Sequence, residues 1–246
     1  MINLENKTAF VTGGGKGIGA GIVRELAYAG SHVIFTYSSS VAQAKELVSD
    51  LEKEGKRVTA IQMNVADAEQ SRSVIEKVGN QYGSIDILVN NAGVFMAKDF
   101  SAHSLEDFDW IMGINFKGVF STILYALPYL PEGGRIITTG SNLADGALAK
   151  GMTLYTTSKS ALQGLTRGLA RDLGEKGITV NLIQPGPTDT DMNPADGPAA
   201  GFVHSRMAIP KHGQPKDIGA LVAFLSSEEA KYITGSIITI DGGMNA

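Results

Sequence analysis

The chain has 246 residues, 43% of them hydrophobic and 19% charged, which is the composition of a globular protein rather than a disordered one. Its 21 basic and 25 acidic side chains give a formal net charge of −4, which excludes the strongly basic surface that gathers nucleic acid or anionic membrane. The lack of cysteine excludes disulfides, thiol catalysis and thiolate metal sites, and it fits a reducing compartment.

The N-terminus has neither the basic start nor the apolar run of a signal peptide, and no stretch reaches the roughly 18 uninterrupted apolar residues of a membrane helix. These features predict a soluble cytoplasmic protein. The four histidines show no paired ligand spacing, so no metal site is expected. A single domain covering residues 1–246 is the simplest organisation for a chain of this length.

A dinucleotide site is predicted near the N-terminus. Residues 8–12 form a short run suited to a buried strand, the glycine-rich segment 13–19 follows it, and helical periodicity continues to Gly30. Glycines let the backbone approach a pyrophosphate closely, and a helix N-terminus offers it free N–H groups. A kinase-type phosphate loop is excluded because Gly17, not Ser or Thr, follows Lys16.

The end of the second predicted strand, residues 32–37, bears on the choice of cofactor. An acidic residue there would hold the ribose 2′-hydroxyl of NADH, but Tyr37 is followed by three serines. Serine hydroxyls and the nearby Lys16 can bind the 2′-phosphate of NADPH, so NADPH is expected over NADH. In the alternative interpretation Lys16 is only solvated and the serines only cap the helix that begins near Val41.

Strands and helices alternate through the rest of the chain. The expected strands cover 57–63, 85–90, 134–139, 179–184 and 236–240, and the expected helices cover 41–53, 68–81, 104–127, 153–176 and 215–226. This order requires right-handed crossovers and predicts an α/β fold: a single-domain Rossmann fold with a doubly wound seven-stranded parallel sheet and helices on both faces. The Pro- and Gly-rich residues at about 186–214 are expected to form a substrate lid.

Tyr155 and Lys159 lie four residues apart on a predicted helix, so they share one face. A nearby ammonium lowers the pKa of a phenol and would make Tyr155 a usable general acid or base. Ser141 lies fourteen residues before Tyr155 at a strand end, and Asn142, thirteen residues before Tyr155, carries an amide instead of a hydroxyl. Ser141 is preferred because it carries a hydroxyl.

Together with Asn115 and the segment Thr12-Gly13-x-x-x-Gly17-x-Gly19, these residues resemble the classical short-chain dehydrogenase/reductase family over nearly the whole chain. The resemblance implies a catalytic set of Asn115, Ser141, Tyr155 and Lys159, with Asn115 holding a water that links to the lysine. The residues expected to line the cofactor are Gly13, Gly15, Lys16, Gly17, Ile18, Gly19, Tyr37, Ser38, Ser39, Asn64, Val65, Asn91, Ala92, Gly93, Tyr155, Lys159, Pro185, Gly186, Thr188 and Thr190.

The resemblance implies an NADPH-dependent oxidoreductase that reduces a small ketone or aldehyde to an alcohol, assembled as a homotetramer. The segments 184–190 and 208–215 also resemble a bacterial branch of the family that includes a cyclic-di-GMP-binding biofilm-dispersal mediator. A binding protein for such a dinucleotide signal is therefore the alternative. A nucleotide-sugar epimerase shares Tyr-x-x-x-Lys, but this chain lacks room for the C-terminal substrate domain of that group.

Overall fold

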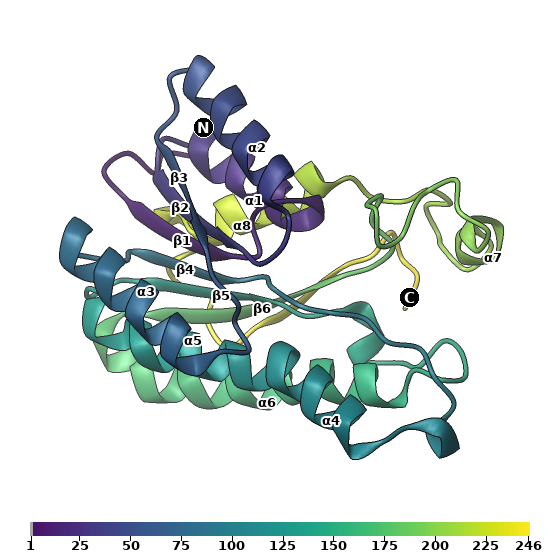
Figure 1. The fold of residues 1–246 in the computed structure, drawn as a ribbon. Helices are drawn as coiled ribbons and strands as arrows, with labels where there is room; N and C mark the ends of the chain where they lie inside the picture. The colour runs from purple at the N-terminus through teal and green to yellow at the C-terminus, as the bar shows by residue number, and fades with distance from the viewer. Residues whose placement is uncertain (1) are drawn as a thin grey trace.

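The computed structural model describes residues 2–246, which form one seven-stranded parallel sheet in the order β3-β2-β1-β4-β5-β6-β7 (Figure 1). The sequence order reverses between β1 and β4, so a crevice opens beyond their carboxyl ends, where ligands bind in open α/β sheets. The strands are β1 Thr8–Thr12, β2 His32–Tyr37, β3 Val58–Gln62, β4 Ile87–Asn90, β5 Arg135–Thr139, β6 Thr179–Pro185 and β7 Ile237–Ile240.

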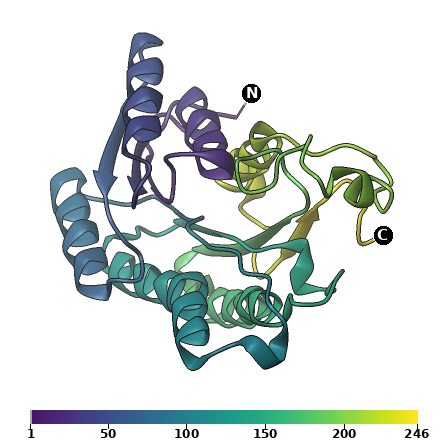
Figure 2. The same cartoon turned by 45° about the vertical axis from the view of Figure 1, so that its right-hand side comes forward.

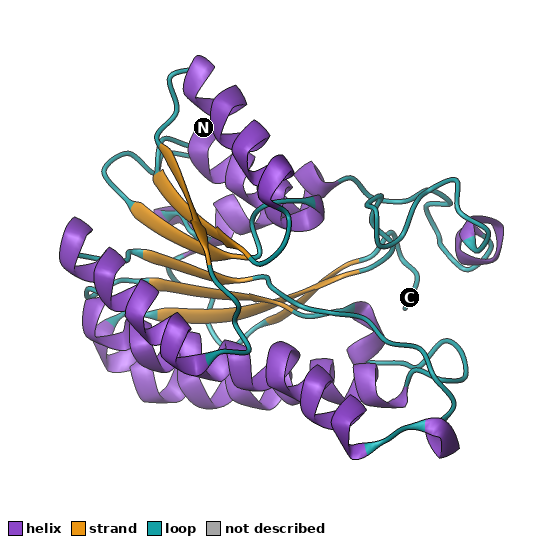
Figure 3. Cartoon of the chain, viewed as in Figure 1, coloured by secondary structure: helices purple, strands orange, loops and turns teal. Residues whose placement is uncertain are grey.

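Helices cover both faces of the sheet, as predicted (Figure 3). Helices α1, α2 and α8 lie on one face, and α3, α4, α5 and α6 lie on the other (Figure 1). Alternate residues of β1 enter separate cores. Ala9 and Val11 pack in the core under α1, α2 and α8, and Phe10 packs in the core under α3, α5 and α6. The helices are α1 Gly17–Tyr28, α2 Val41–Lys53, α3 Ala68–Tyr82, α4 Leu105–Met112, α5 Gly118–Ala126, α6 Thr153–Leu173, α7 Ala200–His204 and α8 Pro215–Leu225.

The helix expected at 104–127 is continuous, but it contains an irregular turn. A π-helical segment, Gly113–Lys117, joins α4 to α5 and carries the fully buried Asn115. Single π turns inside α-helices are frequent at functional sites.

The stretch Leu105–Tyr129 is long and apolar enough to cross a membrane by length and composition. Buried core helices pass the same test, and 44% of the most apolar window is buried here. The stretch packs against α3 and α6, which is the arrangement of a core helix.

The predicted lid leaves the sheet after β6 and carries one short helix, α7, beyond the carboxyl ends of the strands (Figure 1). Its two ends are joined, because Thr188 pairs with Gly213 in an isolated parallel bridge and the Asp189 N–H donates to the Gly213 carbonyl at 2.9 Å. The first and last residues of the predicted lid therefore lie side by side.

Candidate active site

The glycine turn between β1 and α1 has no room for a side chain at Gly14 or Gly19. A Cβ at Gly19 would lie 2.0 Å from the Gly13 carbonyl oxygen, and one at Gly14 would lie 2.6 Å from the Phe35 Cβ. Gly13 and Gly17 also have positive φ, which favours glycine. This cradle lies at the N-terminus of α1, where free backbone N–H groups suit a dinucleotide pyrophosphate. The cofactor contacts of Gly13, Gly15, Gly17, Ile18 and Gly19 stay predictions.

Two polar side chains hold the turn against the end of β4. Thr12 Oγ1 accepts from the backbone N–H groups of Asn91 and Ala92, at 3.0 and 3.1 Å. Asn91 Nδ2 returns two hydrogen bonds to the carbonyls of Thr12 and Gly13, at 3.2 and 3.0 Å. Asn91, predicted as a cofactor residue, therefore shapes the turn, and Thr12 is a contributor that the sequence prediction omitted.

The residues predicted to select the 2′-phosphate lie together at the end of β2. Ser38 and Ser39 are exposed, and Gly15 approaches Tyr37, since a Cβ there would lie 3.2 Å from the Tyr37 Cβ. Ser40 occupies the N-cap position of α2 but makes no side-chain capping hydrogen bond, so capping does not account for this hydroxyl. Lys16 is exposed and pairs with Asp191 of the lid at 3.7 Å.

The predicted adenine neighbours, Asn64 and Val65, follow β3. Asn64 is exposed, and its Oδ1 accepts from the Ala66 N–H at 3.1 Å. Val65 is buried against Gly118, where a Cβ would lie 3.1 Å from the Val65 carbonyl oxygen. Asn64 therefore faces outward while Val65 anchors the loop.

Tyr155 lies in the first turn of α6, beside Ser141 at the end of β5. Burial raises the pKa of the Tyr155 phenol, and hydrogen bonding to the Ser141 side chain opposes that rise. The predicted net lowering of this pKa by Lys159 is therefore wrong: Lys159 Nζ lies 6.0 Å from the centre of the Tyr155 ring, and burial raises the pKa. The phenol stays protonated at neutral pH.

Lys159 is 5% exposed, and its Nζ donates to the Thr139 carbonyl at 3.0 Å. Burial lowers the pKa of its ammonium to about 8. The lysine thus retains its charge at neutral pH but releases a proton more readily than an exposed lysine would. A Cβ at Gly93 would lie 3.3 Å from both Lys159 Nζ and Asn115 Oδ1, so glycine keeps open the space between these two groups.

Asn115 acts as a brace within this cluster. Its Oδ1 accepts from the Val94 N–H at 2.8 Å, and its Nδ2 donates to the Val94 carbonyl at 2.9 Å and to Ser158 Oγ at 3.0 Å. Ser158, fully buried, in turn donates to the Tyr155 carbonyl at 2.7 Å. The sequence prediction omitted Ser158; its position inside Tyr-x-x-x-Lys, three residues after the tyrosine, was the available signal.

Ser141 and Asn142 point to different neighbours. Ser141 interacts with Tyr155, whereas Asn142 Nδ2 donates to Asp241 near the C-terminus at 3.4 Å. The fourteen-residue spacing therefore brings a hydroxyl to the phenol, and the thirteen-residue alternative does not.

The loop after β6 borders the glycine turn. Gly186 follows Pro185, and its Cβ would lie 2.4 Å from the Asp241 Cβ, so only glycine fits. Thr188 is 4% exposed and donates to the Gly186 carbonyl at 3.1 Å. The Thr190 methyl group lies 3.3 Å from the Cβ position of Gly17, which places it over the glycine turn. The predicted carboxamide contacts of Thr188 and Thr190 stay predictions.

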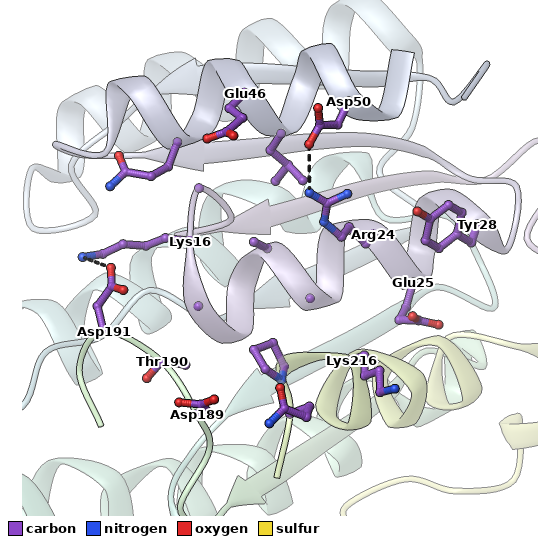
Figure 4. A pocket seen from close by; sticks show the side chains of 18 residues that line it. Lys16, Arg24, Glu25, Tyr28, Glu46, Asp50, Asp189, Thr190, Asp191 and Lys216 are labelled. Carbon is purple, nitrogen blue, oxygen red and sulfur yellow. Dashed lines mark hydrogen bonds and ion pairs between the residues drawn. The ribbon is translucent and has the colours of Figure 1, made fainter. Parts of the chain in front are cut away.

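A groove of about 790 Å³ runs along the outer side of α1, between α2 and the start of α8 (Figure 4). It shares Gly15, Lys16, Gly17 and Thr190 with the cofactor cradle but includes none of the catalytic candidates. Acidic side chains outnumber basic ones on its walls, and two ion pairs, Lys16–Asp191 and Arg24–Asp50, cross it. Away from the glycine turn, the acidic side chains of these walls are unfavourable to an anionic ligand.

Comparison with known proteins gives concordant results. A protein-family model described as enoyl-(acyl carrier protein) reductase matches residues 13–245. The chain is 42% identical over 240 residues to the cyclic-di-GMP-binding biofilm dispersal mediator protein of Escherichia coli (strain K12), covering 98% of each chain.

Two solved structures share the fold and hold the kind of cofactor that the sequence predicts. A blue fluorescent protein from a metagenomic library, in complex with NADPH, has a TM-score of 0.96 and 49% identity, covering 99% of this chain and 100% of that one. A short-chain dehydrogenase from Burkholderia cenocepacia J2315, in complex with NADP, has a TM-score of 0.97 and 48% identity, with the same coverage. The chain belongs to the short-chain dehydrogenase/reductase family.

Proposed function

We propose that this protein reduces a small ketone or aldehyde to an alcohol with NADPH. The main support is that Tyr155, Ser141 and Lys159 lie together at the carboxyl edge of the sheet. The glycine cradle lies at the same edge. Proton donors and a buried cation gathered at a dinucleotide site suit carbonyl reduction.

The residues of this chain would divide the work as follows. The glycine turn, Ser38, Ser39 and Lys16 would hold NADPH, which when bound supplies the hydride for the carbonyl carbon. Ser141 would donate a hydrogen bond to the carbonyl oxygen. Tyr155, protonated because burial raises its pKa, would give its proton to that oxygen, leaving a neutral alcohol.

Lys159 would act on the resulting phenolate. Its buried charge stabilises the anion left by proton transfer, and its pKa of about 8 lets it pass a proton to Tyr155 for the next cycle. Asn115 and Ser158 hold the backbone of this helical turn in register. The same proposal includes the water that the family resemblance implies, held by Asn115 and linked to Lys159.

The test follows NADPH absorbance over a panel of ketones and aldehydes. Tyr155→Phe should lower kcat by about 10² to 10⁴ while leaving the Kd for NADPH nearly unchanged. Tyr232→Phe, at a tyrosine that is 99% exposed, is the matched control and should retain full activity. Full turnover in Tyr155→Phe would refute the proposed role.

Assembly as a soluble cytoplasmic homotetramer is part of the proposal. Helices α4 and α5 expose a row of large apolar side chains, of a kind that subunit contacts bury. They are Leu105, Phe108, Trp110, Phe120 and Leu124. Light scattering at micromolar concentration should give four times the monomer mass; a monomer there would overturn it.

A second candidate function is binding of cyclic-di-GMP, which the 42%-identical relative from Escherichia coli carries in its name. The acidic excess along the α1 groove argues against an anionic dinucleotide there. Isothermal titration with cyclic-di-GMP, with and without saturating NADPH, separates the possibilities. Competition would place both ligands in the cradle, and absence of heat would remove this candidate.

A further inference from the structure

The last residues of the chain fold into a hydrogen-bonded turn, called here the C-terminal turn and defined as Asp241–Asn245. Gly242 and Gly243 have φ values of 66° and 74°, so the chain reverses directly after β7. Asp241 organises the reversal: its Oδ1 accepts from the Gly243 N–H at 2.9 Å, and its Oδ2 accepts from the Asn245 N–H at 3.0 Å. A carboxylate that accepts backbone N–H groups in this way is a strong anchor.

The C-terminal turn holds the residue next to the catalytic serine. Asn142, 3% exposed, donates from Nδ2 to Asp241 Oδ2 at 3.4 Å, and its carbonyl accepts from Asn245 Nδ2 at 2.7 Å. Ser141 directly precedes Asn142, and its Oγ accepts from the Leu143 N–H at 3.2 Å. Both ends of Asn142 are thus tied to the C-terminal turn, which limits how far Ser141 can move.

The same turn also holds the returning arm of the lid, Met207–Ile209. The Ile209 N–H donates to the Gly242 carbonyl at 2.8 Å. A Cβ at Gly242 would lie 2.8 Å from Met207 Cε, and one at Gly243 would lie 2.7 Å from the Ala208 Cβ. Figures 1 and 2 both show the C-terminus beside the segment that carries α7.

We infer that the C-terminal turn is a positioning element, with Asp241 as its positioning residue. It keeps Ser141 and the lid arm Met207–Ile209 fixed relative to each other. The inference rests on the proposed reductase function. The hydrogen bonds of the turn go to Asn142 and Ile209 rather than to Tyr155 or Lys159, which points to an effect through Ser141 and the lid. Asp241 also packs against Gly186 of the loop after β6, so the Kd for NADPH is measured beside kcat.

The test is a double-mutant cycle between Asp241→Asn and Ser141→Ala. The amide of Asp241→Asn would direct an N–H₂ group at a backbone N–H donor, opening the turn without changing side-chain volume. Alone, it should lower kcat about tenfold, because small misplacements of reacting groups are costly. In the Ser141→Ala background it should change kcat less than about twofold; an undiminished tenfold loss there would overturn the inference.

Asp172→Asn, which alters an exposed carboxylate on α6, is the matched control and should leave kcat unchanged. A loss of folded protein would lower the yield and Tm of Asp241→Asn, but it would not make the loss in kcat depend on Ser141. NADPH titration of each variant separates cofactor binding from catalysis.

Hydrogen–deuterium exchange supplies a readout that needs no activity. Asp241→Asn should raise exchange in peptides covering 141–145 and 199–210 by several-fold, and Asp172→Asn should not. If the wild type reduces no carbonyl in the panel, the proposed function fails. The exchange data then still decide whether the C-terminal turn holds these two segments in place. Unchanged exchange in both peptides would overturn the inference.

Discussion

Two regions flank the candidate catalytic residues Ser141, Tyr155 and Lys159, and different kinds of contact hold them. The cofactor side, Gly13–Gly19 with the ends of β1 and β4, is held by backbone atoms so close that a Cβ at Gly19 would lie 2.0 Å from a carbonyl oxygen. The predicted lid, residues 186–214, is held by a few polar pairs and exposes Met192 and Phe202, 65% and 52% accessible. We therefore expect the first region to keep one geometry, whereas the second should respond to substrate and pH.

Gly19→Ala disrupts the cofactor side and should have the largest effect, a loss of NADPH affinity. The added methyl group would overlap the Gly13 carbonyl and lie 2.7 Å from Asn91 Nδ2, so the turn must open. The Kd for NADPH should rise at least about 100-fold, measured by fluorescence titration, and Tm should fall. Gly164→Ala, at an open position in the middle of α6, is the control and should stabilise the fold by about 0.5–1 kcal/mol. Unchanged NADPH affinity in Gly19→Ala would contradict the close-packed cradle.

Ser158→Ala tests the hydrogen bonds that join Asn115 to the first turn of α6. It removes the acceptor for Asn115 Nδ2 and the donor to the Tyr155 carbonyl. Loss of these buried hydrogen bonds should lower the free energy of unfolding by about 1–3 kcal/mol and kcat by about tenfold. Thr157→Ala, exposed on the same turn, should leave both quantities unchanged. Equal effects in the two variants would show that Ser158 has no special role.

Local sequence signals predicted much of the cofactor side. The bounds of β1, β2 and α2 agree residue for residue, because apolar runs and turn residues mark them within a few positions. The π turn at Gly113–Lys117 was not predicted, since helical periodicity does not reveal one extra residue. The sign of the Tyr155 pKa shift was also wrong, because burial depends on how distant segments pack. The contacts of Asp241 with Asn142 likewise join segments far apart in the chain, which no local pattern marks.

Acid should loosen the lid before it affects the cofactor side. His204 Nε2 and His212 Nδ1 lie 2.7 Å apart, and their hydrogen bond joins α7 to the end of the lid. Only one of the two facing nitrogens can carry a proton, because the other must accept the hydrogen bond. Burial and the neighbouring His204 lower the pKa of His212, while Asp189 opposes them. A lowered pKa stabilises the folded lid above the unfolded value of about 6.5, and this contribution is lost as pH falls below it.

The KM for the carbonyl substrate should therefore rise about fivefold between pH 7 and pH 5.5, with the Kd for NADPH changing less. Steady-state kinetics across this range is the measurement. His204→Phe removes the hydrogen-bond partner of His212 while keeping a ring of similar size, so its KM should depend less on pH than that of the wild type. A wild-type KM that is flat across the range would remove the lid from the pH response.

The smallest effect is expected where the lid meets the cofactor side, at Lys16. Its ammonium is 57% exposed and lies 3.7 Å from the Asp191 carboxylate, itself 76% exposed, so water screens the pair. Lys16→Gln should raise the Kd for NADPH about two- to fivefold and leave the Kd for NADH unchanged, because only NADPH carries the 2′-phosphate. Asp191→Asn releases the lysine without moving the cradle, so its NADPH affinity should equal or slightly exceed that of the wild type. Equal losses for both cofactors in Lys16→Gln would assign the lysine to the shared pyrophosphate, and the serines after β2 alone would then distinguish NADPH from NADH.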